Sequence, residues 1–166
     1  MSIFVVDSNF FIEAHRATYP LDVAPSFWNK VKYLADSSKI CSIDKVKSEL
    51  SVHQDDLERW CAANLSDDFF KESSTCLSQY SQIAKWAQSR SGHYLPQAIS
   101  DFLHADEADA FLIAFTLADP SNRILVTQEV ANPLQKNRIK IPDVCKALGV
   151  TCCNTVEMFR KLGETF

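Results

Sequence analysis

Short runs of strand-forming apolar residues alternate with helix-forming segments from one end of the chain to the other. Four runs favour β-strands: residues 3–6, 39–43, 123–127 and 150–153. The intervening segments carry apolar residues at helical spacing, as in Phe27, Val31 and Leu34. Because this alternation is typical of a parallel sheet covered by helices on both faces, we expect an α/β fold of three layers, α/β/α, with a central parallel sheet.

Residues with strong preferences for helix ends mark several of the expected helices. Ser26 and Asp44 are candidate N-caps, Pro142 suits the first turn of a helix, and Gly149 suits its end. Two longer segments also look helical: residues 55–90, and residues 106–118, in which acidic residues come first and apolar residues follow.

Length and composition fit one ordinary globular domain. The chain has 166 residues, of which 46% are hydrophobic and 23% charged, so we expect a single domain over residues 1–166. No apolar run approaches the roughly 20 residues of a membrane helix, and the N-terminal residues lack the basic start of a secretory signal. These features favour a cytoplasmic protein with no membrane partner. The six cysteines form no CxxC pair, and we expect them to be reduced, buried thiols.

Glycine content and net charge exclude several kinds of phosphate-binding protein. With only three glycines, the chain has no glycine-rich loop of the P-loop or dinucleotide-binding type. The net charge of −4 excludes an overall basic coat for nucleic acid. It does not exclude an enzyme that grips phosphate through metal ions, because such a site is built from carboxylates.

Four acidic residues fall where the expected fold would bring them to one edge of the sheet. Asp7 follows the first strand, Glu49 lies in the helix after the second, Asp109 begins the helix before the third, and Glu129 follows that strand. Sites in open parallel sheets form at the carboxyl ends of the strands. Each acid also has a structural interpretation: a helix cap for Asp7, a solvated helix face for Glu49, stabilisation of the helix dipole for Asp109, and a surface loop for Glu129.

Together the four carboxylates predict a metal site. Carboxylates gathered in a small volume repel one another and need a cation to stay ionised. Oxygen ligands without histidine or cysteine select Mg²⁺ or Mn²⁺. One or two such ions would activate water for hydrolysis of a phosphodiester. Ser8, Asn9 and Thr127 are candidates to orient the carboxylates or waters, and Asp106 is either a further ligand or a helix cap.

Four segments of the chain resemble the PIN-domain family of metal-dependent ribonucleases. They are VVDSNFFI at 5–12, IDKVKSEL at 43–50, ADAFLIAFTLA at 108–118 and ILVTQE at 124–129. The family has an acid in an Asp-Ser/Thr-Asn/Ser turn, a helical Glu, and an Asp before an Ala-rich helix, which match Asp7, Glu49 and Asp109. Its fourth acid is usually an Asp two residues after a Thr or Ser. Here Glu129 follows Thr127, and its extra methylene could let it reach a metal directly or through water.

The resemblance implies a PIN-like fold and a Mg²⁺- or Mn²⁺-dependent endoribonuclease acting on single-stranded or structured RNA. Residues 140–152, KIPDVCKALGVTC, resemble a PIN-like subgroup of predicted toxins encoded beside an antitoxin. The resemblance therefore also implies the toxin of a toxin–antitoxin pair, an antitoxin partner and a homodimer. Lys136, Arg138 and Lys140 adjoin Glu129 and are either RNA-backbone contacts or a solvated loop.

Two other interpretations stay open at this stage. A non-catalytic PIN-like binding protein would keep the fold without the activity, and the Glu at position 129 favours that interpretation. A phosphatase of the haloacid dehalogenase type also places an Asp after its first strand. It needs a second Asp two residues later, where this chain has Asn9.

Overall fold

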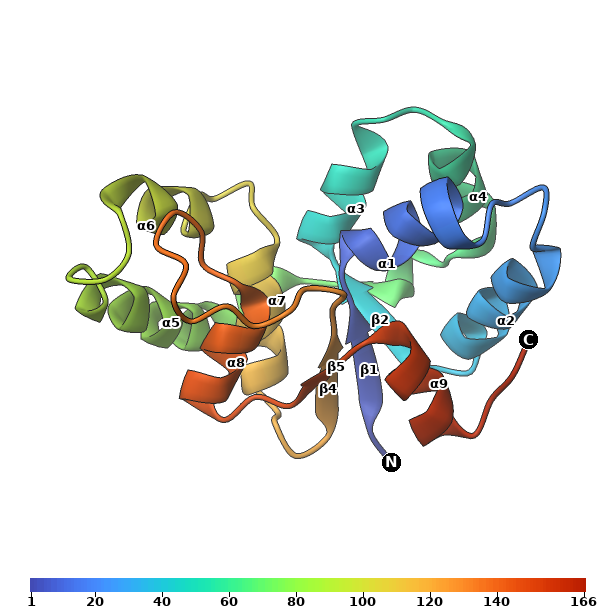
Figure 1. The fold of residues 1–166 in the computed structure, drawn as a ribbon. Coiled ribbons are helices and arrows are strands. Elements are labelled where there is room, and N and C mark those ends of the chain that lie inside the picture. The colour runs from blue at the N-terminus through green and yellow to red at the C-terminus, as the bar shows by residue number, and fades with distance from the viewer.

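A sheet of five parallel strands runs through the middle of the molecule (Figure 1). The computed structural model describes all 166 residues. The strands are β1 (Ile3–Val6), β2 (Ile40–Ile43), β3 (Phe70–Lys71), β4 (Arg123–Val126) and β5 (Cys152–Cys153). They lie in the order β3-β2-β1-β4-β5, and every neighbouring pair is parallel.

Nine α-helices cover the two faces of this sheet. They are α1 (Ser8–Glu13), α2 (Pro25–Asp36), α3 (Asp44–Ser51), α4 (Asp56–Asn64), α5 (Leu77–Ser89), α6 (Pro96–Phe102), α7 (Asp109–Leu117), α8 (Ile141–Leu148) and α9 (Thr155–Leu162). Figure 1 shows α5 to α8 on one side of the sheet and α1 to α4 with α9 on the other. The prediction of a three-layer α/β/α fold with a central parallel sheet is confirmed.

The predicted elements differ from the observed ones mainly between residues 55 and 102. The segment 55–90 is not continuous helix: two single turns of 3₁₀-helix, at Asp67–Phe69 and Ser73–Cys76, flank the short strand β3. Helix α6, which begins at Pro96, was not predicted. Ser26 and Asp44 both lie inside their helices, whose N-cap residues are Ala24 and Ile43.

Most of the apolar side chains form one continuous core. Forty-three buried hydrophobic residues belong to a single cluster. Helix α7 is buried on every side, since each residue from Ala110 to Thr116 is buried. All six cysteines are unpaired, and five of them are buried. No helix is long and apolar enough to cross a membrane.

The order of the strands changes side at β1. From β1 the chain first builds β2 and β3 on one side, and it then returns to the other side for β4 and β5. Val6 of β1 is in register with Val126 of β4. The next residues, Asp7 and Thr127, therefore stand at the carboxyl ends of two adjacent strands, at the point where open α/β sheets usually bind ligands.

Candidate active site

Asp7 is a buried acid whose charge is disfavoured by its surroundings. It is 3% exposed and caps α1, because its Oδ1 accepts a hydrogen bond of 2.8 Å from the backbone N–H of Phe10. Burial, together with the negative charges of Asp109 and Glu129, raises the pKa of Asp7 from 3.8 to about 7. The hydrogen bonds from Phe10 and the Thr127 side chain oppose this shift. Asp7 therefore has both features predicted for it: it caps a helix, and it follows the end of a strand.

Asp109 is the first residue of α7, and it is partly buried. Burial raises its pKa to about 7 as well, with further contributions from the charges of Glu129 and Glu49, while the charge of Arg138 lowers it. Two acids that share one small volume and resist ionisation form a place where a cation would be stabilised.

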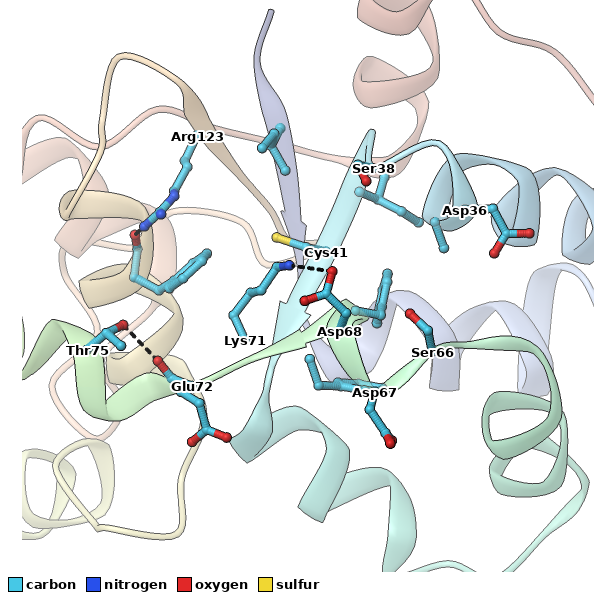
Figure 2. Close-up of a pocket in the computed structure, with 16 residues that line it drawn as sticks. Asp36, Ser38, Cys41, Ser66, Asp67, Asp68, Lys71, Glu72, Thr75 and Arg123 are labelled. Carbon is cyan, nitrogen blue, oxygen red and sulfur yellow. Dashed lines mark hydrogen bonds and ion pairs between the residues drawn. The ribbon is translucent and has the colours of Figure 1, made fainter.

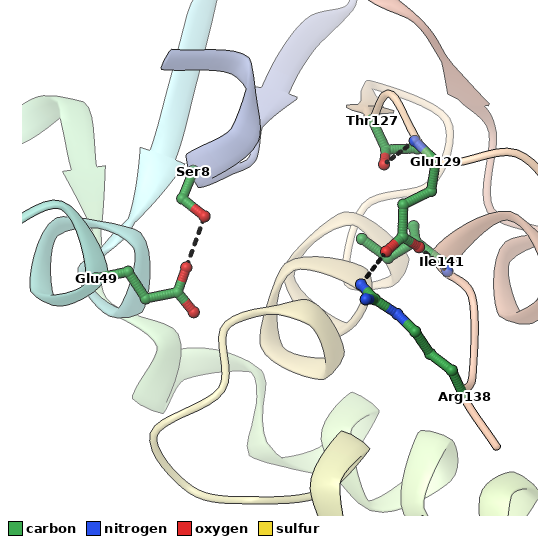
Figure 3. A network of polar contacts seen from close by, with 6 residues as sticks. All are labelled: Ser8, Glu49, Thr127, Glu129, Arg138 and Ile141. Atoms are coloured by element: carbon green, nitrogen blue, oxygen red, sulfur yellow. Dashed lines mark hydrogen bonds and ion pairs between the residues drawn. The ribbon is translucent and has the colours of Figure 1, made fainter. Parts of the chain in front are cut away.

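Glu49 of α3 links the starts of α1 and α7, and Figure 3 shows its contact with Ser8. Its Oε2 accepts a hydrogen bond of 2.6 Å from the Ser8 hydroxyl, and its Oε1 accepts one of 3.1 Å from the backbone N–H of Ala108. Ser8 begins α1, and Ala108 is the N-cap residue of α7. The predicted partnership between Ser8 and an acidic site residue is thus present.

Glu129 is held on the other side of the site by three contacts, all drawn in Figure 3. Its backbone N–H donates to Thr127 Oγ1 at 3.1 Å. Its Oε1 accepts from the guanidinium of Arg138 at 2.6 Å, and its Oε2 accepts from the backbone N–H of Ile141 at 2.8 Å. The glutamate side chain is 9% exposed.

The four predicted acids lie close enough at one edge of the sheet to influence one another's charge. They do not form a complete metal-binding site. No group of three or more histidine, cysteine, aspartate or glutamate side chains stands close enough to hold a metal ion. Asp7 and Asp109 fit a magnesium-type ion by their chemistry, because Mg²⁺ often uses one or two carboxylates and keeps several waters. Glu49 and Glu129 already accept two hydrogen bonds each from the protein.

The structure also shows the surroundings of the other predicted site residues. Asn9 is exposed and makes no side-chain hydrogen bond to the protein. The side chain of Asp106 is 90% exposed and faces His104, so the prediction that Asp106 caps α7 is wrong. Lys136 is exposed, and Lys140 is the N-cap residue of α8.

A small pocket opens beside Asp109. It has a volume of about 300 Å³ and lies between α6, the turn before α7 and residues 137–139. Its lining includes Phe102, Glu107, Asp109 and Arg138. Of the four predicted acids, Asp109 is therefore the one that a molecule in this pocket would meet.

The largest pocket of the molecule lies toward the opposite end of the sheet (Figure 2). Its volume is about 710 Å³, and its lining includes Ile3, Ile40 and Arg123, the first residues of β1, β2 and β4. Lys71 pairs with Asp68 in it at 3.3 Å. Burial raises the pKa of its Cys41 thiol to about 11, so this sulfur stays protonated and is a poor nucleophile at neutral pH.

Two hydrogen-bond donors in the candidate site could not be predicted from the sequence. They are the backbone N–H groups of Ala108 and Ile141, which hold Glu49 and Glu129. Main-chain donors are present at almost every residue, so only the path of the chain shows which of them meet a carboxylate.

Comparison with known proteins identifies the family of the chain. No curated protein and no solved structure matches the chain. A family model described as "Domain of unknown function (DUF4411)" matches residues 4–166. Because the match spans nearly the whole chain, the protein belongs to the DUF4411 family of domains of unknown function.

Proposed function

We propose that the protein is a metal-dependent endoribonuclease that hydrolyses phosphodiester bonds of RNA. The observation that carries the proposal is the pair of acids, buried Asp7 and partly buried Asp109, near the carboxyl ends of β1 and β4. Each acid has its pKa raised to about 7 by burial, with a further contribution from neighbouring carboxylates. The resemblance of residues 5–12 and 108–118 to PIN-domain ribonucleases supports the same activity.

In this proposal Asp7 and Asp109 hold Mg²⁺ or Mn²⁺. A bound ion of this kind supplies Lewis-acid activation of water and neutralises charge on the phosphate. The protein keeps Asp7 in place through the Phe10 N–H and Thr127. Glu49, fixed by Ser8 and Ala108, adds negative charge beside Asp109.

The biological setting is also a proposal. The resemblance of residues 140–152 to predicted toxins supports the toxin of a toxin–antitoxin pair, with an antitoxin as partner and a homodimer as assembly. Six unpaired cysteines suit the reducing cytoplasm. The alternative of a dehalogenase-type phosphatase gains no support, because Asn9 stands where that class needs a second Asp.

Cleavage of single-stranded RNA by the purified protein tests the proposed activity. We expect cleavage in Mn²⁺, none in EDTA, and a loss of roughly 100-fold or more for Asp7→Asn and Asp109→Asn. Asn at position 7 can still accept the capping hydrogen bond, so the variant should fold. Asp22→Asn, at an exposed acid with no partner, is the matched control.

Calorimetric titration with Mn²⁺ completes the test. A protein that binds neither Mn²⁺ nor RNA would contradict the proposal. RNA binding without cleavage, unaffected by Asp7→Asn, would instead support the non-catalytic binding protein.

A further inference from the structure

Glu129 joins the two ends of the basic loop, defined here as residues 130–140. One carboxylate oxygen accepts from Arg138 at 2.6 Å, and the other accepts from the Ile141 N–H at 2.8 Å. The side chain is 9% exposed. Both oxygens thus already accept a hydrogen bond. The two donors lie nine and twelve positions after Glu129 in the sequence.

The basic loop has no helix or strand of its own, so individual contacts determine its path. Besides Glu129, the loop is held by the N–H of Asn132, which donates to Asp143 at 3.0 Å. The carbonyl of Lys136 accepts from the N–H of Leu95 at 2.9 Å. Among the contacts of the loop, only that from Glu129 fixes the head group of a cationic side chain, Arg138.

Arg138 is the only cation lining the small pocket beside Asp109. Its side chain is 54% exposed, and a guanidinium has five N–H donors in a planar fork. One of its nitrogens contacts Glu129, which leaves donors free to meet a molecule in the pocket. Asp101 and Glu107 also line the pocket and are exposed, so only the part of the pocket near Arg138 favours an anion.

We propose that Glu129 is a positioning residue rather than a metal ligand, and that it holds Arg138 to bind a phosphate of the RNA backbone beside Asp109. The proposal rests on the proposed function and names the group that meets the phosphate. A guanidinium suits this role because it can bind two phosphate oxygens at once. Glutamate suits the anchor, because its longer side chain reaches both Ile141 and Arg138 while its backbone stays beside Thr127.

Two measurements on the full chain test this assignment. The first is the affinity for Mn²⁺ by calorimetry. We expect Glu129→Gln to bind Mn²⁺ within about twofold of wild type, while Asp109→Asn loses roughly tenfold or more. Gln keeps an oxygen for the Ile141 N–H, and circular dichroism checks that the variant is folded.

The second is the affinity for a short fluorescein-labelled single-stranded RNA, measured by anisotropy in EDTA. We expect Arg138→Ala to weaken binding by about tenfold, since it removes a charge-assisted contact. Glu129→Gln should weaken it by about threefold to tenfold, and should add nothing in the Arg138→Ala background. Arg138→Gln, which leaves the Glu129–Ile141 contact intact, should behave like Arg138→Ala. Lys85→Ala, at an exposed cation on α5, should bind like wild type.

The outcomes separate this proposal from the one it rests on. If Glu129→Gln loses Mn²⁺ as severely as Asp109→Asn, Glu129 is a ligand and the inference is wrong, while the proposed nuclease stands. If the effects of Glu129→Gln and Arg138→Ala on RNA affinity are simply additive, the positioning role is wrong. If the wild-type protein binds neither Mn²⁺ nor RNA, the proposed function fails and this inference fails with it.

Discussion

Two kinds of interaction have opposite effects on the charge of Asp7. The Phe10 N–H at the start of α1 favours the ionised carboxylate, as expected for a helix cap. Burial and the neighbouring acids favour the protonated form, and they dominate, since the pKa rises from 3.8 to about 7. Asp109 shows the same shift at the start of α7. Near neutral pH, each of these two acids is therefore partly protonated in the metal-free protein.

This shift predicts that the metal-free protein is more stable in mild acid than in mild base. Both acids bind protons more tightly in the folded than in the unfolded chain, so the free energy of unfolding falls as pH rises from about 4 through about 7. A rise of the pKa from 3.8 to about 7 corresponds to about 4 kcal/mol for one group. Because the negative charge of Asp109 is itself one cause of the rise at Asp7, we do not expect twice that value. Urea unfolding in EDTA at about pH 5 and about pH 8 measures the difference.

The variants Asp7→Asn and Asp109→Asn locate the effect. Each should reduce the dependence on pH over that interval and raise stability at the higher pH. Asp22→Asn should keep the wild-type dependence, because this exposed acid has no partner. An equal slope in all four proteins would show that the two buried acids are not its source.

The placement of these acids was predictable because strand ends and helix starts have local signals. Asp7 follows an apolar run and Asp109 precedes one, so the positions of both can be read from the sequence. The contacts of Glu129 were not predictable in the same way. They depend on how the basic loop returns to the site, and no residue pattern specifies that Arg138 rather than Lys136 meets the carboxylate.

At the scale of elements, α7 depends on a neighbour for the start of its helix. This buried helix has no N-cap side chain of its own, since its N-cap residue is Ala108. The Ala108 N–H instead donates to Glu49 of α3 at 3.1 Å. Glu49 thus stabilises the helix that positions Asp109, in addition to its charge near the candidate site.

We therefore expect Glu49→Ala to destabilise the protein by about 1–2 kcal/mol, because it leaves a helix end without its partner. Glu49→Gln should cost less, since its amide oxygen can accept from the same N–H. Chemical unfolding of both variants measures the difference. Glu72→Ala, at an exposed glutamate whose side chain has no partner, is the control. Equal stability of Glu49→Ala and the control would contradict the capping role.

Strand β3 shows why some elements escape prediction. It consists of Phe70 and Lys71 alone and pairs with Ser42 and Ile43 of β2. Two residues are too few to show the alternation that distinguishes a strand from a helix. Its neighbours Phe69, Leu77 and Tyr80 fit a helical spacing, so the local pattern favoured a single long helix. Only pairing with β2 reveals the strand.

For the molecule as a whole, the alternation of strands and helices indicated the layers but not the order of the strands. A parallel sheet with helices on both faces follows from the alternation. The order β3-β2-β1-β4-β5 arises because the chain adds β2 and β3 on one side of β1 and then adds β4 and β5 on the other side. The sequence does not show where this change of side occurs. The change of side places Asp7 next to Thr127.

The single core predicts that both helical layers unfold together. Trp28 and Trp60 pack edge to face on one side of the sheet, and Trp86 lies in α5 on the other. In urea, tryptophan fluorescence and far-ultraviolet circular dichroism should give coincident transitions. The variant Trp86→Phe, which leaves only the probes of the first layer, should report the same midpoint by both methods. Separate midpoints would show two independently folding layers.

The raised pKa values of Asp7 and Asp109 have a consequence for ion uptake. Near neutral pH each acid is partly protonated, so a divalent ion that binds them must displace protons into the solvent. The heat of binding would then vary with the ionisation enthalpy of the buffer, and affinity would weaken steadily as the solution is acidified below about pH 7. The burial that disfavours charge on these two acids would thus couple ion binding to the acidity of the solution.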